Sequence, residues 1–355
     1  MVSREYVLEL LEKLSNAFSP PGFEDEVRNI VREELEGIVD EIRVDALGNL
    51  IAYKRGSDKY PSIMLDAHMD EVGFLITHID KKGFLRFQPL GGFDDRVLYA
   101  QQVMIMTKDG KKIPGFIGAK PPHLLKPEER TKIISIDELF IDIGASSDKE
   151  VREIGVDIGC VGTFATRFRI LSKKRVLGKA FDDRAGLTAM ISALKILKDT
   201  DYNIIAVASV QEEVGLRGAR TAAWQVSPDI ALALEGTAAA DIPGIPEHKE
   251  STALGKGPAI TIADRSIIAH PKIVRLLISV AEERGIPYQF KRVIAGGTDA
   301  GVIHLTKAGV PSGVVSVPCR YIHSSAAVMD INDLENAIKL VVGFVEKASK
   351  ELIKK

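Results

Sequence analysis

The stretch Ile204-Ile205-Ala206-Val207-Ala208-Ser209-Val210-Gln211-Glu212-Glu213-Val214-Gly215 decides the fold that we expect. Its first seven residues carry no charge, which is typical of a strand buried on both faces of a helix-covered sheet. The carboxyl ends of such strands open onto the ligand crevice of an α/β protein. Adjacent glutamates there can divide the work, with one binding a metal and the other acting as general base. The alternative for Glu212 and Glu213 is a pair of solvated loop charges.

Strands and helices alternate on both sides of this stretch. The patterns predict helices over 185–197, 271–284 and 331–353, and strands over 229–234 and 311–317. The first 70 residues have the same character. They carry two apolar helical stripes, a hairpin pattern around Gly48-Asn49, and a short buried strand that leads to His68. Such alternation indicates an α/β fold with a largely parallel sheet flanked by helices.

The central part of the chain differs from both flanks. From about residue 72 to 165, short β-like runs follow one another, separated by turn residues, and no long helix is evident. This pattern indicates a small β domain of the barrel or sandwich type. We therefore expect residues 1–70 and 166–355 to form one α/β catalytic domain, which residues 71–165 interrupt as an inserted β domain.

Composition excludes several classes of protein. The chain has 355 residues, 27% of them charged, and a net charge of −2, without the basic surplus that is usual in nucleic-acid binders. No apolar run is long enough for a transmembrane helix, and the N-terminus lacks the apolar core of a signal peptide. Two cysteines make no disulfide framework, which favours the cytoplasm. The scarcity of Asn and Gln, six of each, is typical of a thermophile.

Residues suited to metal binding follow several of the predicted strands. His68 follows the strand near residue 63, Glu235 follows the strand at 229–234, and His323 follows the strand at 311–317. Asp182 and Glu213 complete a set of two histidines and three carboxylates. With one carboxylate bridging, this set supplies N and O ligands for two zinc-like ions and leaves positions open for water.

Each member of the set has an ordinary alternative. His68 and Asp70 occur together by chance in many surface loops, and an aspartate before a helix, as at Asp182 and Asp183, is normally a cap. If the metal site is real, Asp70 is positioned to accept the second ring N–H of His68. The conjunction of all the members is a much stronger signal than any one of them.

Two further segments are candidates for substrate binding. The glycine turn 296–301 contains Thr298 and Asp299 and enters a helix, so it is suited to bind an anion or a substrate backbone. His123 lies on a loop that can approach a substrate. Lysines and arginines in loop 119–132 add charge there, although such clusters are usually just solvated.

At this point the sequence resembles the TET-type aminopeptidases, a family of metallopeptidases with two catalytic metal ions that includes glutamyl and deblocking aminopeptidases and some members once labelled cellulases. The resemblance covers essentially the whole chain. Its markers, in order, are Ala67-His68-Met69-Asp70-Glu71-Val72-Gly73, Phe181-Asp182-Asp183-Arg184, Gln211–Ala219, Gly297-Thr298-Asp299-Ala300 and Arg320-Tyr321-Ile322-His323-Ser324.

The resemblance implies a role for each residue of the set. Asp182 bridges two divalent ions, Zn or Co, while His68 and Glu235 are terminal ligands on opposite ions. Glu213 and His323 complete the coordination. Glu212 is the general base and Asp70 orients His68. The family frequently has Asp where this chain has Glu235, whose extra methylene shifts the carboxylate.

The resemblance also implies a fold, an assembly and a reaction. The fold is a phosphorylase/hydrolase-like α/β domain carrying a small PDZ-like β-barrel used for dimerisation. The assembly is a tetrahedral homododecamer built from dimers. The reaction is the hydrolysis of N-terminal residues from peptides. A carboxypeptidase or N-acyl-amino-acid deacylase with the same two-metal site is the alternative. A metal-free glycosidase leaves the two histidines without a purpose. The five intact ligands and the intact base argue against a non-catalytic chamber or binding protein.

Overall fold

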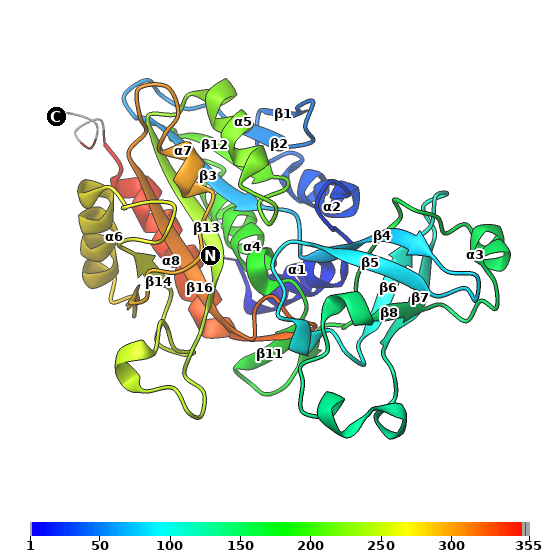
Figure 1. Ribbon diagram of the computed structural model, residues 1–355. Helices are drawn as coiled ribbons and strands as arrows, with labels where there is room; N and C mark the ends of the chain where they lie inside the picture. The colour runs from blue at the N-terminus through cyan, green and yellow to red at the C-terminus, as the bar shows by residue number, and fades with distance from the viewer. Residues whose placement is uncertain (1, 350–351, 353–355) are drawn as a thin grey trace.

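The computed structural model describes residues 2–349 and 352 and contains two sheets (Figure 1). The larger sheet has eleven strands, and its main path runs β1-β2-β12-β3-β13-β16-β17-β11-β10, with β14 and β15 joined to it at β16. Its strands are β1 (Glu41–Val44), β2 (Leu50–Lys54), β3 (Ser62–His68), β10 (Arg169–Ile170), β11 (Arg175–Gly178), β12 (Asn203–Ser209), β13 (Ile230–Ala238), β14 (Ala259–Thr261), β15 (Gln289–Lys291), β16 (Ser312–Arg320) and β17 (Ala327–Asp330). The α/β fold expected from the sequence is confirmed.

The centre of the large sheet is parallel and buried on both faces. Strands β12, β3, β13 and β16 run in the same direction. Ile63 and Leu65 contact the core on one face, whereas Met64 between them contacts the core on the other face, as the two-residue period of a strand requires. The sequence shows no polar alternation in these strands because both faces are covered.

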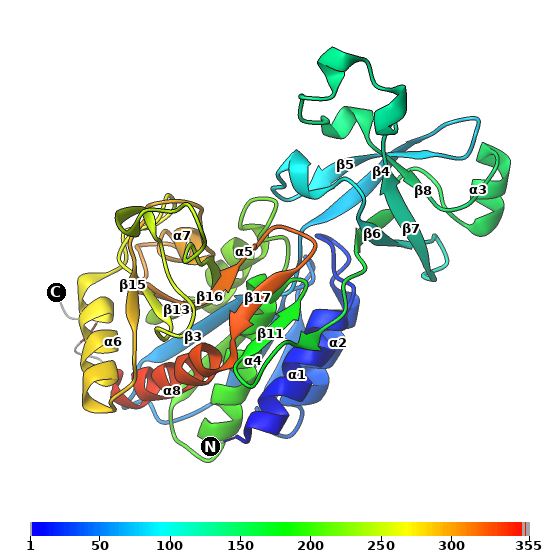
Figure 2. The same cartoon turned by 90° about the horizontal axis from the view of Figure 1, so that it is seen from below.

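Helices cover the two faces of this sheet unequally (Figures 1 and 2). The larger layer comprises α1 (Arg4–Asn16), α2 (Asp25–Leu35), α4 (Phe181–Leu197), α6 (Pro271–Glu283) and α8 (Ile331–Lys347). The opposite face carries α5 (Arg217–Val226) and the single-turn α7 (Ala300–Ile303). None of the helices in the described part of the chain combines the length and apolarity that a membrane span requires.

The last helix is shorter than its pattern predicts. Asp330 caps α8 by accepting a hydrogen bond from the backbone N–H of Asn332 at 2.8 Å, and the apolar stripe packs against α4 and α6. The helix ends at Lys347, where Ala348 turns to extended backbone. The expected helix is therefore wrong at residues 348 and 349, which are not helical. Residue 353, where it was expected to end, lies outside the described residues.

The second sheet closes into an antiparallel barrel in the order β4-β5-β8-β7-β6-β9. Its strands are β4 (Gly73–Ile79), β5 (Leu85–Leu90), β6 (Gln102–Met106), β7 (Lys112–Gly118), β8 (Phe140–Asp142) and β9 (Val161–Phe164), and the short helix α3 (Asp148–Ile154) lies beside them. Figure 2 shows the barrel standing to one side of the large sheet and its helices. All six strands fall within the predicted insertion, while the exact division at 70–71 and 165–166 stays a prediction.

The barrel has its own core of aromatic side chains. Phe74 is fully buried, and its ring centroid lies 5.2 Å from that of Phe87 and 5.3 Å from those of Phe93 and Phe164. Three of these rings come from strands and Phe93 comes from the loop after β5. A separate core of this kind allows the barrel to hold its shape without support from the large sheet.

A buried ion pair lies beside the two segments through which the chain passes between the large sheet and the barrel. Glu71 precedes β4, and both of its carboxylate oxygens accept hydrogen bonds from Lys179 Nζ, at 2.6 and 2.7 Å. The same carboxylate accepts bonds from Thr163 Oγ1 on β9 at 3.0 Å and from the Ser19 backbone N–H at 3.0 Å. These bonds tie both connecting segments to the large sheet, next to the turn that follows His68.

Candidate metal centre and active site

The strand ends bring the candidate residues together. His68 is the last residue of β3, Glu212 and Glu213 follow β12, Glu235 lies on β13, and His323 follows β16. Because these four strands are parallel, their carboxyl ends lie at one edge of the sheet. Asp182 reaches the same edge from the start of α4. The residues are far apart in the sequence and are placed together only by the order of the strands.

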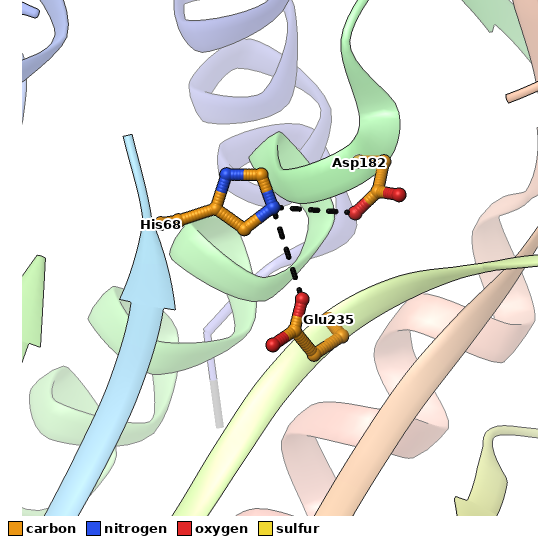
Figure 3. Close-up of side chains that lie close together, drawn as sticks. All are labelled: His68, Asp182 and Glu235. Atoms are coloured by element: carbon orange, nitrogen blue, oxygen red, sulfur yellow. Dashed lines mark ion pairs between the residues drawn. The ribbon is translucent and has the colours of Figure 1, made fainter. Parts of the chain in front are cut away.

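The side chains form two groups that share Asp182. In the first, His68 Nε2 lies 3.4 Å from Asp182 Oδ1 and 3.8 Å from Glu235 Oε2 (Figure 3). In the second, His323 Nε2 lies 3.7 Å from Asp182 Oδ2 and 3.4 Å from Glu213 Oε2. Within each group, one ligand atom from each residue lies within 4.8 Å of the others. Asp182 therefore presents one carboxylate oxygen to each group.

This grouping corrects one expectation. His68 and Glu235 lie on the same side of Asp182, so they are not positioned as terminal ligands of opposite ions. The reason is the strand order, in which β3 and β13 are hydrogen-bonded neighbours, so that His68 at the end of β3 and Glu235 within β13 lie side by side. Glu213 and His323 form the other group, because the loops after β12 and β16 both extend past the sheet edge.

Both histidines direct the same nitrogen at the carboxylates. His68 Nδ1 lies 3.1 Å from the main-chain oxygen of Asp70, and His323 Nδ1 lies 3.0 Å from that of Gly92. A carbonyl oxygen can only accept a hydrogen bond, so Nδ1 of each histidine must carry the ring proton. The Nε2 atom of each ring is then unprotonated, and its lone pair is directed toward the carboxylates of its group. Metal-binding histidines are usually fixed in this way. The donor set, two imidazoles and three carboxylates in two groups, therefore fits two divalent ions.

The Asp70 carboxylate holds the backbone of Glu212 and Glu213, in addition to lying near His68. Its Oδ1 accepts a hydrogen bond from the Glu212 backbone N–H at 2.9 Å, and its Oδ2 accepts one from the Glu213 backbone N–H at 3.1 Å. The distance from His68 Nδ1 to Asp70 Oδ1 is 3.4 Å, longer than its distance to the Asp70 main-chain oxygen. The fully buried Asp70 carboxylate thus sets the position of residues 212 and 213.

The two aspartates before α4 have different tasks. Asp183 is fully buried and accepts hydrogen bonds from the Gly186 backbone N–H at 2.8 Å and from the His68 backbone N–H at 3.2 Å. It acts as the helix cap that the sequence suggested for one of the pair, and Asp182 is left to face the centre. Gly236 permits this approach, because a Cβ at that position would lie 2.8 Å from the Asp182 Cα.

Arg184 is a supporting residue that the sequence analysis did not identify. Its guanidinium is completely buried and donates to the main-chain oxygens of Met69 at 2.5 Å and Leu14 at 3.1 Å. These bonds fix the turn that carries Asp70. No local sequence pattern signals this role, because a buried arginine is rare and its hydrogen-bond partners come from distant parts of the chain.

Left-handed backbone conformations occur around the centre at residues other than glycine. Ala180, Gln211, Leu216, Tyr321 and His323 have φ between 55° and 63°. Such conformations cost free energy and persist where the surrounding structure enforces them, which is common at functional sites. Here they lie in the segments that place Asp182, the two glutamates and His323.

Burial and mutual repulsion shape the pKa values of the acids. Burial raises the pKa of Glu212 and Glu235 well above the ordinary range and that of Glu213 to about 7. Burial also acts on Asp182, but its interactions with the nearby His323 and His68 rings outweigh it and lower the pKa of Asp182 below the ordinary range. A group of carboxylates removed from water in this way favours cations as partners.

The histidines respond to the same field. Burial alone lowers the pKa of His323, yet the nearby Glu213 and Asp182 raise it to about 9. The pKa of His68 is likewise raised against the effect of burial, by Asp182 and Asp70. The carboxylates thus attract positive charge to both groups.

A cavity of about 500 Å³ lies in front of the centre. It is lined by Asp182, Glu212, Glu213, Glu235 and His323 of the centre and by residues 215–216, 236–238 and 295–298, together with Lys249, Ser251, Lys291 and Val293. A second cleft, of about 580 Å³, touches His323 from the other side, between the loop that starts at Gly92 and the turn 321–326. The centre therefore lies where two openings meet.

The predicted substrate-binding residues occupy different places. Thr298 lines the cavity. Asp299 is fully buried behind Glu235, where its backbone N–H donates to Glu235 Oε1 at 3.1 Å and its carboxylate accepts from Ser209 Oγ at 2.7 Å. His123 is exposed in a short 3-10 turn and is not among the residues that line the cavity. Their roles in binding substrate stay predictions.

Comparison with known proteins identifies the family. A sequence profile of the M42 glutamyl aminopeptidase family matches residues 48–340. A lysyl aminopeptidase of Pyrococcus furiosus is 37% identical over 96% of this chain and 96% of its own length.

Two solved structures have the same fold. An aminopeptidase from Desulfurococcus kamchatkensis has a TM-score of 0.95 at 44% identity, covering 99% of this chain and 97% of that one. The TET1 peptidase of Pyrococcus horikoshii has a TM-score of 0.85 at 36% identity, covering 96% of this chain and 99% of that one. The resemblance to TET-type aminopeptidases is confirmed, and this chain belongs to the M42 glutamyl aminopeptidase family of peptide-bond hydrolases.

Proposed function

We propose that this protein is a metalloaminopeptidase that uses two divalent ions, zinc or cobalt, and Glu212 as general base. The observation that carries the proposal is the pair of three-residue groups that share Asp182, with Glu212 beside them and in neither group. When bound, two such ions would lower the pKa of a water molecule and polarise the scissile carbonyl.

The position of Glu212 fits proton transfer. Within the described part of the chain, its carboxylate forms no ion pair or hydrogen bond, while its backbone N–H is held by Asp70. Its side chain lines the cavity next to the ligand candidates. Glu212 takes the proton of the attacking water and delivers it to the leaving amine, which is the work of a general base that later acts as an acid.

The two openings define how a peptide lies. The free α-amine of a substrate is a cation, and the carboxylates that can receive it face the 500 Å³ cavity. The first residue therefore occupies that cavity, and its side chain lies there too, because Cβ is two bonds from the amine nitrogen. The rest of the peptide leaves through the second cleft, which is lined by His323 but by none of the four carboxylates of the metal centre.

The test compares free and blocked substrates. Purified protein is given p-nitroanilides of several amino acids and their N-acetyl counterparts, with Zn²⁺ or Co²⁺ and again after chelation. Cleavage of the free-amine compounds alone, lost with chelator and restored by metal, is the expected result. Cleavage confined to blocked compounds would instead indicate the deacylase alternative, and indifference to chelator would remove the metal mechanism.

A single substitution tests the general base. Glu212→Gln keeps the size of the side chain and lies outside both metal groups, so we expect metal binding to persist while kcat falls by about 10²–10⁴-fold. The control is Glu247→Gln, because Glu247 is exposed and does not line the cavity; its turnover should equal that of the wild type. Wild-type turnover in Glu212→Gln would refute the assignment.

The proposal extends to the assembly and the cellular setting of the protein. The TET1 peptidase of P. horikoshii assembles into a tetrahedron or a larger octahedral shell, and we expect this chain to form a tetrahedral dodecamer from dimers joined through the barrel. Cys160 and Cys319 are both free and buried, which is consistent with the predicted cytoplasmic setting. Sedimentation of purified protein measures the assembly size, and thermal unfolding tests the predicted thermophilic origin.

A further inference from the structure

The cavity in front of the metal centre has two lysines in its wall. Lys249 lies on the segment that follows β13, and Lys291 is the last residue of β15. The carboxylates that line the cavity are Asp182, Glu212, Glu213 and Glu235, and all four belong to the catalytic centre. Among the described residues that line the cavity, these two lysines are therefore the charged side chains outside the catalytic centre, and no further acidic residue accompanies them.

Neither ammonium group has a counter-ion within the part of the chain that the structure describes. Across residues 2–349 and 352, the side chains of Lys249 and Lys291 form no ion pair or hydrogen bond. Lys179 shows the contrast, because Glu71 and a main-chain oxygen accept all of its hydrogen bonds. Lys291 is half-buried and Lys249 is exposed. A partly desolvated ammonium without a partner gains free energy when an anion binds beside it.

The remaining wall is mostly apolar. Val293, Ala295, Leu216 and Ile322 line the same cavity and offer contact to methylene groups without hydrogen-bonding partners. A volume of about 500 Å³ is ample for one amino-acid side chain. The wall thus suits a short aliphatic chain that ends in a negative charge.

These features select a substrate class. We propose that the enzyme prefers peptides with an acidic first residue, glutamate or aspartate, whose side-chain carboxylate binds Lys291 and Lys249. The inference rests on the proposed function, because it is the α-amine at the carboxylate end of the cavity that places the first side chain between the lysines. Kinship leaves this choice open, since the family carries the name glutamyl whereas the P. furiosus relative is named a lysyl aminopeptidase.

The experiment measures kcat/KM for the p-nitroanilides of Glu, Gln, Lys and Leu with saturating metal ion. Glu and Gln have nearly the same shape, so their ratio isolates the charge. One charge-assisted contact in a partly exposed site predicts a Glu:Gln ratio of about 10. The ratio should fall as salt is raised, because ions screen partly exposed charges.

Matched variants assign the effect to the two lysines. Lys291→Met and Lys249→Met remove the charge with little change in length, and each should lower the Glu:Gln ratio toward 1. The double variant Lys249→Glu/Lys291→Glu should favour the Lys substrate over the Glu substrate. Lys256→Met is the control, because Lys256 is exposed on the neighbouring loop and does not line the cavity; its ratio should equal that of the wild type.

The outcomes separate this inference from the proposed function. Hydrolysis of the Leu compound with a Glu:Gln ratio of 1 or less overturns the acidic preference and leaves the aminopeptidase assignment intact. Leu-Gly has a free C-terminal carboxylate and Leu-Gly-amide has none. If the enzyme prefers Leu-Gly and this preference disappears in Lys291→Met, the acidic side-chain preference is also overturned, because the lysines would then bind the C-terminal carboxylate. Failure to hydrolyse any free-amine compound with metal present counts against the proposed function itself.

Discussion

Replacing Asp70 by Asn tests how the glutamate pair is held. The Asp70 carboxylate is fully buried and accepts two backbone N–H bonds, from Glu212 at 2.9 Å and from Glu213 at 3.1 Å. An asparagine side chain has one acceptor oxygen, so its NH₂ group would face one of those N–H groups. The substitution keeps the volume and removes one charge-assisted bond.

The size of the effect follows from that geometry. A hydrogen bond to a charged group contributes about 1.5–3 kcal/mol, and a buried donor left without a partner costs a similar amount. Since 1.36 kcal/mol is a factor of ten, displacement of residues 212–213 should lower kcat by about 10–150-fold. At the group that contains His68, affinity for metal should change less than kcat, because His68 keeps its bond to the Asp70 main-chain oxygen. At the group that contains Glu213, affinity should fall as that residue is displaced.

The assay is steady-state kinetics at saturating metal, together with calorimetric titration of the metal. Asp45→Asn is the control, because Asp45 also accepts backbone N–H bonds, from Leu47, Gly48 and Asn49, but lies in the turn after β1. We expect that control to lose stability without losing kcat. Full recovery of Asp70→Asn turnover by excess metal would show that Asp70 acts only through metal affinity and not through the position of Glu212. That result would refute this reasoning, as would wild-type kcat.

Three further predictions concern stability. Burial raises the pKa of Glu24 from 4.5 to about 7, so from pH 4.5 to 7 the folded protein keeps a proton that the unfolded chain releases. Wild-type stability should therefore fall with rising pH in that window, by up to about 3 kcal/mol relative to Glu24→Gln; denaturant unfolding of both proteins measures the difference, and a constant difference contradicts the prediction. Phe74→Ala should cost about 3–5 kcal/mol and speed hydrogen exchange in the barrel before the large sheet; equal changes in both would mean that the two cores unfold together. Removing metal should lower Tm, and restoring Zn²⁺ to a thousand times its Kd should add about 4 kcal/mol; a Tm indifferent to chelator would argue against a bound metal.

The fold was largely predictable because its patterns are local. An uncharged run such as residues 204–209 indicates a strand that is buried on both faces, and the apolar stripe of α1 indicates a helix that is buried on one face. Each pattern is visible within a dozen residues. The barrel was predictable only as a run of short strands. Its closure depends on the pairing of β4 with β9, which are separated by most of the insertion.

The site was predictable in its members but not in its arrangement. Polar residues that interrupt or follow uncharged runs identify His68, Glu213 and Glu235, although the structure places His68 and Glu235 within their strands. Which of them share a group depends on the neighbours of each strand, and the sequence places β3 and β13 far apart. Supporting residues such as Arg184 carry no local pattern.

The sequence by itself thus determined the kinds of element, the family and the metal-binding residue types, since these depend on burial and chemistry at each position. Only the tertiary structure decided that His68 and Glu235 lie together, that Asp70 holds the backbone of residues 212 and 213, and that Lys249 and Lys291 lie in one cavity wall. The physical reason is that these relations join residues from separate strands and loops, whose distances are set by strand order and packing rather than by their separation along the chain.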